Sequence, residues 1–291
     1  MNNKEKIALI TGASSGIGRA AAQAFADSGY IVYGTSRGAG GETVSDGGAP
    51  YTLLPLTLED EKSVESAVNT IASRHGRIDV LVNAAGSGIA GAVEETAADE
   101  ARAQFDVCFF GVITVLYYVL PLMRARRGGV IINIGSMASS FPIPFQGMYS
   151  SVKAALLMLT ATLRLELEPF GIKVCAVEPG DTRTSFTERR VFTKKTAQTA
   201  YKKPLERALY EMIRSELSAH GPERCAKTIL KMARKKKPPV RVSVGIDYKL
   251  FYLLAKIMPL RAKEFVLRKM YLSKNPPDDA VWTFGKQFEE K

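Results

Sequence analysis

Short apolar runs alternate along the chain with longer stretches of helical spacing. The runs cover residues 6–11, 30–36, 79–86, 128–136 and 172–180. They show almost no polar alternation, which is typical of parallel strands covered on both faces. Between them, residues 17–29, 59–76 and 149–171 space their apolar positions as helices do, and each stretch ends at a glycine. The pattern predicts an α/β fold: a doubly wound, Rossmann-type parallel sheet with helices on both faces.

The pattern changes after residue 180. Residues 181–222 are charged and rich in threonine, without a clear strand, and a long excursion at this edge of a sheet predicts a substrate lid. A basic turn and a last strand follow, and then basic amphipathic helices broken at Pro259. We therefore divide the chain into a Rossmann-fold catalytic domain, residues 1–245, which contains the lid segment 181–222, and a C-terminal extension, residues 246–291.

One uncharged run, Val107 to Met123, is 17 residues long and contains Gly111 and Pro121. That length is at the lower edge of what spans a bilayer. A helix that is buried on most sides, in the core or in a subunit interface, explains the run better.

Positive charge gathers in the last third of the chain. Residues 183–291 hold 26 Lys and Arg against 11 Asp and Glu, whereas residues 1–182 hold 14 against 18. Such asymmetry is typical of a polyanionic partner, although a solvated surface gives the same bias. We expect an anionic membrane surface to be the partner and expect no nucleic acid.

The rest of the composition narrows the class of protein. Three widely spaced cysteines predict neither a disulfide framework nor a zinc site, and two histidines make a metal centre improbable. The first residues carry no apolar stretch of the signal-peptide kind. We therefore expect a cytoplasmic protein without a metal, able to associate peripherally with a membrane.

Tyr149 and Lys153 stand four residues apart at the head of an apolar run, "MYSSVKAALL". Residues with this spacing are neighbours on a helix surface. A lysine cation beside a phenol stabilises the phenolate, and the pKa of the tyrosine falls from ~10 toward the range useful to an acid–base catalyst. An interfacial tyrosine with a lysine reaching for solvent has the same spacing, so the pair alone leaves both interpretations open.

A glycine-rich turn, "TGASSGIG", runs from Thr11 to Gly18 between the first predicted strand and helix. Its glycines let the backbone turn sharply, and the N–H groups of the new helix can bind a phosphate. The same letters match the G-x-S-x-G elbow of α/β-hydrolases, for which His220 could complete a triad. That alternative places the elbow after the very first strand and gives Tyr149 and Lys153 no role.

Together these motifs resemble the short-chain dehydrogenase/reductase family from Lys6 to about Thr184. The glycine turn is followed by "NAAG" at residues 83–86, by Ser136 at 13 residues before Tyr149, and by "PGDTRT" at residues 179–184. The resemblance implies an oxidoreductase that interconverts a ketone or aldehyde with its alcohol. Tyr149 would exchange the proton, Lys153 would lower its pKa and hold the nicotinamide ribose, and Ser136 would bind the substrate oxygen.

The resemblance also implies a set of cofactor-binding residues. They are Gly12, Ser14, Ser15, Gly16, Ile17, Gly18, Arg37, Thr57, Asn83, Ala84, Gly86, Tyr149, Lys153, Pro179, Gly180, Thr182 and Thr184. At the end of the second strand, NAD enzymes usually carry an acid for the ribose hydroxyl. Here "YGTSRG" offers Arg37 instead, which could clamp a phosphate. We therefore expect NADP(H) to be preferred, with NAD(H) as the alternative.

Two positions depart from the family pattern. Thr57 stands where an aspartate usually reads the adenine, and Cys108 stands where an asparagine usually holds a water behind the catalytic lysine. Cysteine is a poor hydrogen-bonding substitute for an amide. Cys108 therefore keeps a second function class open, a cofactor-binding regulatory protein of the same fold with weak or no turnover.

The C-terminal sequence indicates the substrate. It resembles tails of relatives that act on steroids, retinoids or keto-lipids, so we expect a small apolar carbonyl or alcohol substrate. An apolar face forms from Leu250, Phe251, Leu253, Leu254, Ile257 and Met258, flanked by Lys249, Lys256, Arg261 and Lys263. Such a helix can lie in a membrane interface, cap the pocket or pack as core. For the whole molecule we expect a homodimer or homotetramer.

Overall fold

A parallel sheet forms the centre of the molecule in the computed structural model, which describes residues 6–273 except 39, 46, 246–247, 250–251 and 254–256. The strand order is β10-β8-β7-β5-β1-β2-β4-β3, and only β3 runs antiparallel to its neighbour. The strands are β1 (Ile7–Thr11), β2 (Ile31–Ser36), β3 (Thr43–Val44), β4 (Tyr51–Pro55), β5 (Val80–Asn83), β7 (Gly129–Ile134), β8 (Ile172–Glu178) and β10 (Arg241–Ser243). The order reverses direction at β1, which lies between β2 and β5, and the predicted doubly wound sheet is thereby confirmed.

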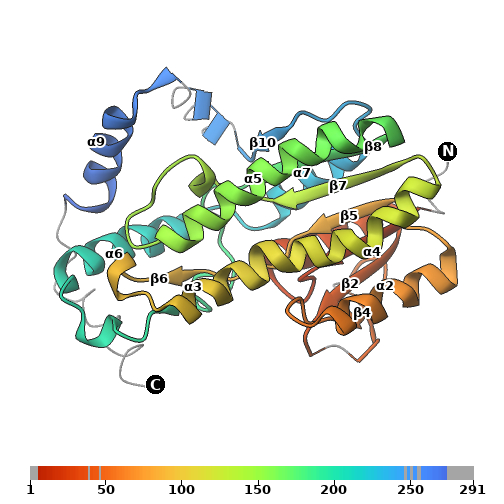
Figure 1. Ribbon diagram of the computed structural model, residues 1–291, viewed down its shortest axis with the longest axis horizontal. Helices are drawn as coiled ribbons and strands as arrows, with labels where there is room; N and C mark the ends of the chain where they lie inside the picture. Colours follow the sequence, from red (N-terminus) through yellow and green to blue (C-terminus); the bar gives the residue numbers. More distant parts are fainter. Residues whose placement is uncertain are drawn as a thin grey trace.

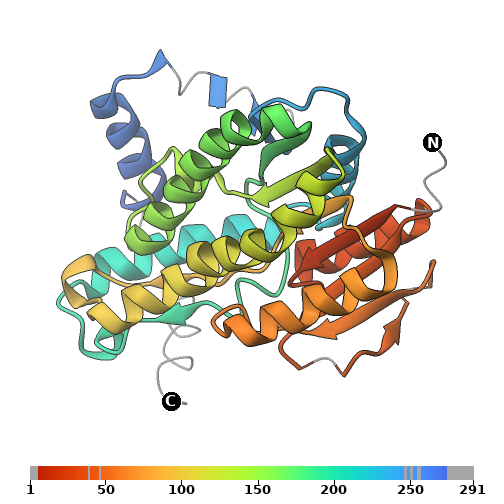
Figure 2. The same ribbon diagram turned by 45° about the vertical axis from the view of Figure 1, so that its right-hand side comes forward.

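Helices cover both faces of this sheet (Figures 1 and 2). On one face, α1 (Gly16–Asp27) and α7 (Glu223–Arg234) pack on the strands through small and apolar side chains such as Phe25 and Ile229. On the other face lie α2 (Glu61–His75), α4 (Gly111–Ala125) and α5 (Gly147–Leu167). Because both faces are covered, the strands bury nearly every side chain, as their continuous apolar runs require.

The apolar run at residues 107–123 forms part of one long helix. It begins with α3 (Ala98–Phe105), passes through a π-helical turn, Asp106–Phe110, and continues as α4. Val115 and Val119 are fully buried, whereas Phe110, Ile113 and Tyr117 are exposed. The stretch Ala98–Ala125 is long and apolar enough to cross a membrane by length and composition, a test that core helices also pass. One side of the helix packs on the sheet, and 33% of its most apolar stretch is buried, so the run is only in part the buried helix that the sequence predicts.

The lid segment, residues 181–222, contains more regular structure than its sequence predicts. It holds β9 (Val191–Phe192), which pairs in parallel with β6 (Ile89–Ala90), and the long helix α6 (Lys202–Ser218). The strands are two residues long, too short to show as a pattern in the sequence. Their pairing joins the lid to the segment after β5 and so fixes its course over the sheet edge.

The C-terminal extension lies at the same end of the molecule. After Pro259 the helix α9 (Leu260–Tyr271) runs beside α6, beyond the carboxyl ends of the strands (Figures 1 and 2). Leu267 is buried in a small cluster with Met137 and Phe141. Among the residues of the apolar face predicted for this extension, Leu250, Phe251 and Leu254 lie outside the described part of the chain.

Candidate active site

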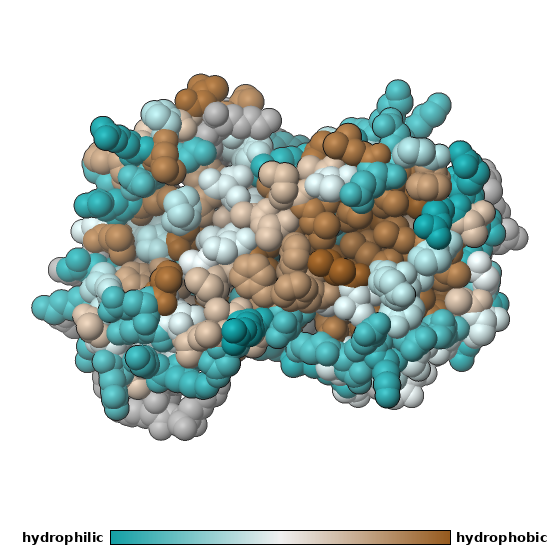
Figure 3. Space-filling view, viewed as in Figure 1, coloured by the Kyte–Doolittle hydropathy of each residue, from teal (hydrophilic) through white to brown (hydrophobic). Residues whose placement is uncertain are grey.

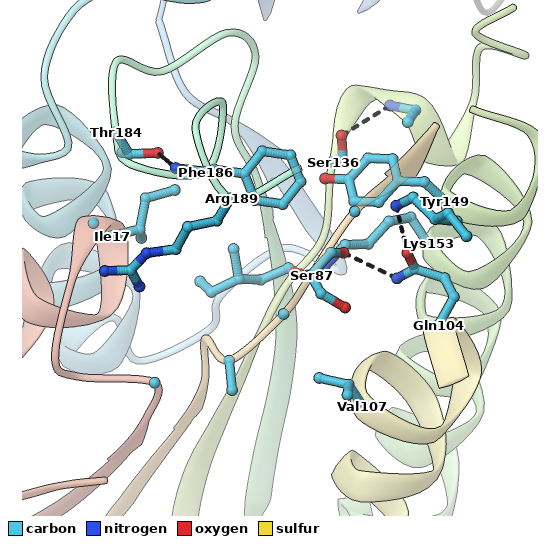
Figure 4. Close-up of a pocket in the computed structure, with 18 of the residues that line it drawn as sticks. Ile17, Ser87, Gln104, Val107, Ser136, Tyr149, Lys153, Thr184, Phe186 and Arg189 are labelled. Carbon is cyan, nitrogen blue, oxygen red and sulfur yellow. Dashed lines mark hydrogen bonds between the residues drawn. The ribbon is translucent and has the colours of Figure 1, made fainter. Parts of the chain in front are cut away.

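A cavity of about 1110 Å³ opens at the carboxyl edge of the sheet. It extends from the glycine turn between β1 and α1 to the inner face of α9. This is the edge at which doubly wound sheets bind their ligands. Figure 4 shows Ser136, Tyr149 and Lys153 on one side of the space, and Phe186 and Arg189 of the lid facing them.

The predicted catalytic residues come together at the centre of the cavity. Tyr149 and Lys153 lie on the first turns of α5, and the Lys153 ammonium is 5.8 Å from the centre of the Tyr149 ring. Lys153 is buried and its Nζ donates to the Ile134 carbonyl oxygen at 2.8 Å, which fixes its position. Ser136 follows β7 and faces the same space, while its Oγ accepts from the Ala138 amide at 3.1 Å.

The glycine turn fits the diphosphate of a dinucleotide. Gly12 has a φ of +69°, and a Cβ there would stand 2.7 Å from the Ala85 Cα, so only glycine allows this close approach. A Cβ at Gly18 would collide with the Gly12 carbonyl. The turn therefore presents bare backbone and the N-terminus of α1 to the cavity, where N–H groups and the helix dipole favour an anion.

Most of the predicted cofactor residues line this cavity, and two do not. Leu58 and Glu59 line the wall where Thr57 was expected, and the Thr57 amide donates to Ser63 Oγ at 3.0 Å. Asn83 is buried within the sheet, where its Nδ2 donates to Asn133 Oδ1 at 2.8 Å. Asn83 thus ties β5 to β7 rather than facing a ligand.

Cys108 lies in the π-helical turn, 1% exposed, and is missing from the described cavity lining. Its Sγ accepts from the Ser87 amide at 3.5 Å and from Gln104 Nε2 at 3.1 Å. Gln104, one turn earlier, does line the cavity; its Nε2 also donates to the Ser87 carbonyl, and its Oε1 accepts from the Ile89 amide. An amide is therefore present beside the position where the family asparagine is replaced. The sequence alone does not point to Gln104, because its partners Ser87 and Ile89 come after β5, far from it in the chain.

The turn that carries Ser136 is held from behind by a buried ion pair that sequence reasoning also missed. Glu178, at the end of β8, is fully buried and accepts from Arg241 Nε at 2.6 Å. Ser139 Oγ donates to the same carboxylate, and Arg241 Nη2 donates to Ser140 Oγ at 2.9 Å. The pair thereby fixes the residues that follow Ser136.

The lid brings an aromatic ring over the catalytic tyrosine. The Phe186 ring centre is 5.7 Å from that of Tyr149, and the ring also packs on Gly88. Behind it, the buried Arg190 pairs with Glu216 of α6 at 2.5 Å, and Thr187 Oγ1 donates to the same carboxylate. These contacts hold the lid over the cavity.

The C-terminal extension closes the far end of the cavity. Leu267, Met270 and Tyr271 of α9 line it, and burial raises the pKa of Tyr271, so that its hydroxyl stays protonated. The Tyr248 ring packs directly on Gly180, and its hydroxyl donates to Asp181 Oδ2 at 3.0 Å. The helix α9, which follows the predicted apolar face of residues 250–258, thus lines the far end of the pocket.

Other chemistries find no support at this site. In the described part of the chain, no three His, Cys, Asp or Glu side chains gather as metal ligands. His220 lines a separate cavity of about 20 Å³, away from the glycine turn, which leaves the hydrolase triad unassembled. Burial raises the pKa of Cys225 and raises that of Cys175 to about 12, so both thiols are protonated core groups rather than nucleophiles.

Comparison with known proteins agrees with this geometry. Residues 6–195 match the short chain dehydrogenase family. A 3-ketodihydrosphingosine reductase from Bacteroides thetaiotaomicron is 39% identical over 268 residues, covering 91% of this chain and 98% of that protein. A short-chain dehydrogenase from Streptomyces avermitilis superposes with a TM-score of 0.72 at 30% identity, over 91% of this chain and 97% of that one.

A further solved structure shows the likeness of fold alone. It is a short chain dehydrogenase/reductase from Burkholderia phymatum in complex with NAD, with a TM-score of 0.73 at 21% identity over 95% of this chain and all of that one. The sheet order, the paired Tyr149 and Lys153 and the match over two thirds of the sequence lead to one conclusion. This chain belongs to the short-chain dehydrogenase/reductase family and is an NAD(P)-dependent oxidoreductase of carbonyl and alcohol groups.

Proposed function

We propose that the protein reduces the ketone of a long-chain keto-lipid with NADPH. The observation that carries this proposal is the apolar end of the cavity. Beyond Tyr149, the wall is built from Phe141 and from Leu267, Met270 and Tyr271 of α9. An apolar chain attached to the reacting carbonyl would bury its surface there, which is worth about 25 cal/mol per Å² removed from water. The 3-ketodihydrosphingosine reductase relative supports a 3-keto lipid in particular.

Each residue at the centre of the cavity has a separate part in such a reduction. The bound cofactor supplies the hydride. The Tyr149 hydroxyl donates its proton to the carbonyl oxygen, and the Ser136 hydroxyl donates a hydrogen bond to that oxygen as negative charge develops on it. The Lys153 ammonium, held by the Ile134 carbonyl, stabilises the phenolate that remains. In the reverse direction Tyr149 accepts the proton of the alcohol.

Arg37 supports NADP(H) over NAD(H). It follows Ser36 at the end of β2, is exposed, and lines the cavity where the adenosine ribose of the cofactor would lie. A guanidinium there can bind the 2′-phosphate that distinguishes NADPH. The carboxylate on this wall belongs to Glu59, which follows β4. It therefore does not occupy the position after β2 where NAD enzymes usually carry an acid.

The outer face of α9 supports delivery of the substrate from an anionic membrane surface. Arg261, Phe265, Arg268 and Lys269 share the side of the helix that faces solvent, opposite the buried Leu267. Phe265 is 60% exposed, with the Lys269 Nζ 5.2 Å from its ring centre. A basic helix face with an exposed aromatic ring is typical of helices that bind lipid headgroups.

The proposal is tested by following NADPH oxidation with a panel of carbonyl compounds: 3-ketodihydrosphingosine, a 3-ketoacyl thioester, a steroid ketone and retinal. We expect kcat/KM for the long-chain 3-keto lipid to exceed that for the steroid and retinal by at least about tenfold, and we expect turnover in Tyr149→Phe to be lower by ~100-fold or more. A steroid or retinal that reacts faster would overturn the keto-lipid assignment. Cofactor binding without reduction of any ketone would favour the regulatory protein.

A further inference from the structure

The lid reaches beyond the catalytic centre to the glycine turn. Arg189 Nη1 donates to Ser15 Oγ at 3.0 Å, joining residues 174 positions apart in the chain. Ser15 is the N-cap residue of α1, but its side chain caps no backbone group of that helix. Its hydroxyl is therefore available to the lid and to the cavity that both residues line.

The positive charge at this contact has no counterion among the described residues. The N-terminus of a helix carries a partial positive charge, and a guanidinium beside it is unfavourable unless an anion accompanies them. The first turn of α1 contains no acidic residue, and Arg189 makes no ion pair within the described residues. A group with two negative charges placed between Arg189 and the turn would satisfy both, and a diphosphate has that charge and that size.

The neighbours of Arg189 hold it in place. Arg190 is buried and paired with Glu216, and the Arg189 amide donates to the Ser185 carbonyl at 3.1 Å. Arg189 itself is exposed to the cavity. The two adjacent arginines thus have different environments. Arg190 holds the lid on α6, whereas Arg189 faces the cavity and can bind a ligand there.

We propose that Arg189 binds the diphosphate of the nicotinamide dinucleotide and so fastens the lid over the cofactor. The proposal depends on the family's cofactor and not on the proposed substrate. Phe186, three residues earlier, packs against Tyr149. Binding of the diphosphate at Arg189 would therefore act on the same lid segment whose Phe186 ring covers Tyr149.

Equilibrium binding separates this role from that of Arg37. Both NADPH and NADH carry the diphosphate, so Arg189→Ala should weaken both by a similar factor, about tenfold or more for a lost charge-assisted hydrogen bond. The affinity for ADP-ribose should fall likewise, whereas adenosine 2′-monophosphate, which lacks the diphosphate, should bind as before. Arg37→Ala should show the opposite selectivity. Its affinity for NADPH and for adenosine 2′-monophosphate should fall, and its affinity for NADH should stay the same.

Lys195→Ala is the control, because Lys195 is an exposed cation of the same lid segment and is missing from the described cavity lining. It should leave all four affinities unchanged.

As a second readout, ADP-ribose should slow tryptic cleavage at residues 183–195 in the natural protein and not in Arg189→Ala. An Arg189→Ala variant whose affinities for NADPH and NADH are within twofold of those of the natural protein would overturn the proposal. An equal loss of affinity for adenosine 2′-monophosphate would also overturn it. None of these measurements requires a lipid substrate.

Discussion

At the scale of single residues, the replacement of the family asparagine by Cys108 is the largest departure in the active site. The structure places the thiol behind the cavity wall, in contact with Ser87 and Gln104. A free cysteine in such a place behaves as a small buried hydrophobe. The amide of Gln104 reaches the cavity from the preceding turn. We therefore expect the proton path to Lys153 not to depend on the side chain at position 108.

We accordingly expect Cys108→Asn to change kcat by less than about tenfold, a barrier change under ~1.4 kcal/mol. Steady-state turnover of the lipid ketone measures this. Gln104→Leu is the informative comparison, because it leaves the buried Ile89 amide without its acceptor. A gain in Cys108→Asn well above tenfold would show that the natural protein works with a damaged relay.

Glu178 is a second residue that affects the site indirectly, through its buried carboxylate. Glu178→Gln should lower the free energy of unfolding by about 3 kcal/mol, because it leaves Arg241 without its countercharge. Since the pair holds the turn after Ser136, kcat should fall while NADPH still binds. Urea unfolding and cofactor titration measure the two effects.

The matched control for Glu178→Gln breaks an exposed pair. Asp99 lies 2.8 Å from Lys194 with both side chains largely in solvent, and the hydrogen bond from Lys194 holds the pKa of Asp99 below its usual value. Asp99→Asn should leave the unfolding midpoint nearly unchanged, as for most surface pairs. Equal stability losses in the two variants would contradict the special role of Glu178.

At the scale of elements, α9 has two faces for which we expect separate tasks. The buried face, through Leu267, closes the cavity, and the outer face carries Phe265 among cations. Phe265→Glu should therefore reduce pelleting with anionic vesicles without changing turnover of a short, soluble ketone. Leu267→Asp should impair turnover of both kinds of ketone. Vesicle binding that persists in Phe265→Glu, or that is unaffected by salt, would contradict the membrane role.

Sequence patterns predict the elements to the extent that their information is local. The long strands and helices appear in the apolar spacing, and Tyr149, Lys153 and Ser136 are found through their motifs. By contrast, β6 and β9 pair over two residues each, and Ser15 meets Arg189 across 174 positions. No local pattern encodes such contacts, because the intervening chain decides them. Thr57 and Asn83 are absent from the described cavity lining, which their motifs could not reveal, since a motif fixes the position of a residue along the chain and not the direction of its side chain.

At the scale of the whole molecule, an apolar surface remains uncovered on the outside of α4 and α5. Its largest exposed side chains are Phe110, Ile113, Tyr117, Met158 and Leu165. Figure 3 shows apolar side chains gathered over α4 on this face. Patches of this kind in soluble proteins usually mark an interface. The patch favours the expected homodimer or homotetramer, with a second copy of this chain as the occupant.

Sedimentation velocity tests the patch directly. The natural protein should sediment as a dimer or tetramer, and the double variant Tyr117→Glu, Leu165→Glu should sediment as a monomer, because both side chains are more than two thirds exposed at 69% and 74%. The control is Leu217→Glu, an exposed leucine of α6 outside the patch, which should leave the assembly intact. A natural protein that is monomeric at micromolar concentration would contradict this account.

In the proposed mechanism Tyr149 transfers the proton while the cofactor and the lid keep their positions. Replacing Tyr149 by phenylalanine keeps the ring that packs against Phe186 and removes only the hydroxyl. The account predicts that kcat for the lipid ketone falls by ~100-fold or more, as expected for loss of a general acid, while the Kd for NADPH stays within about twofold. Near-normal turnover in Tyr149→Phe with intact cofactor binding would contradict it.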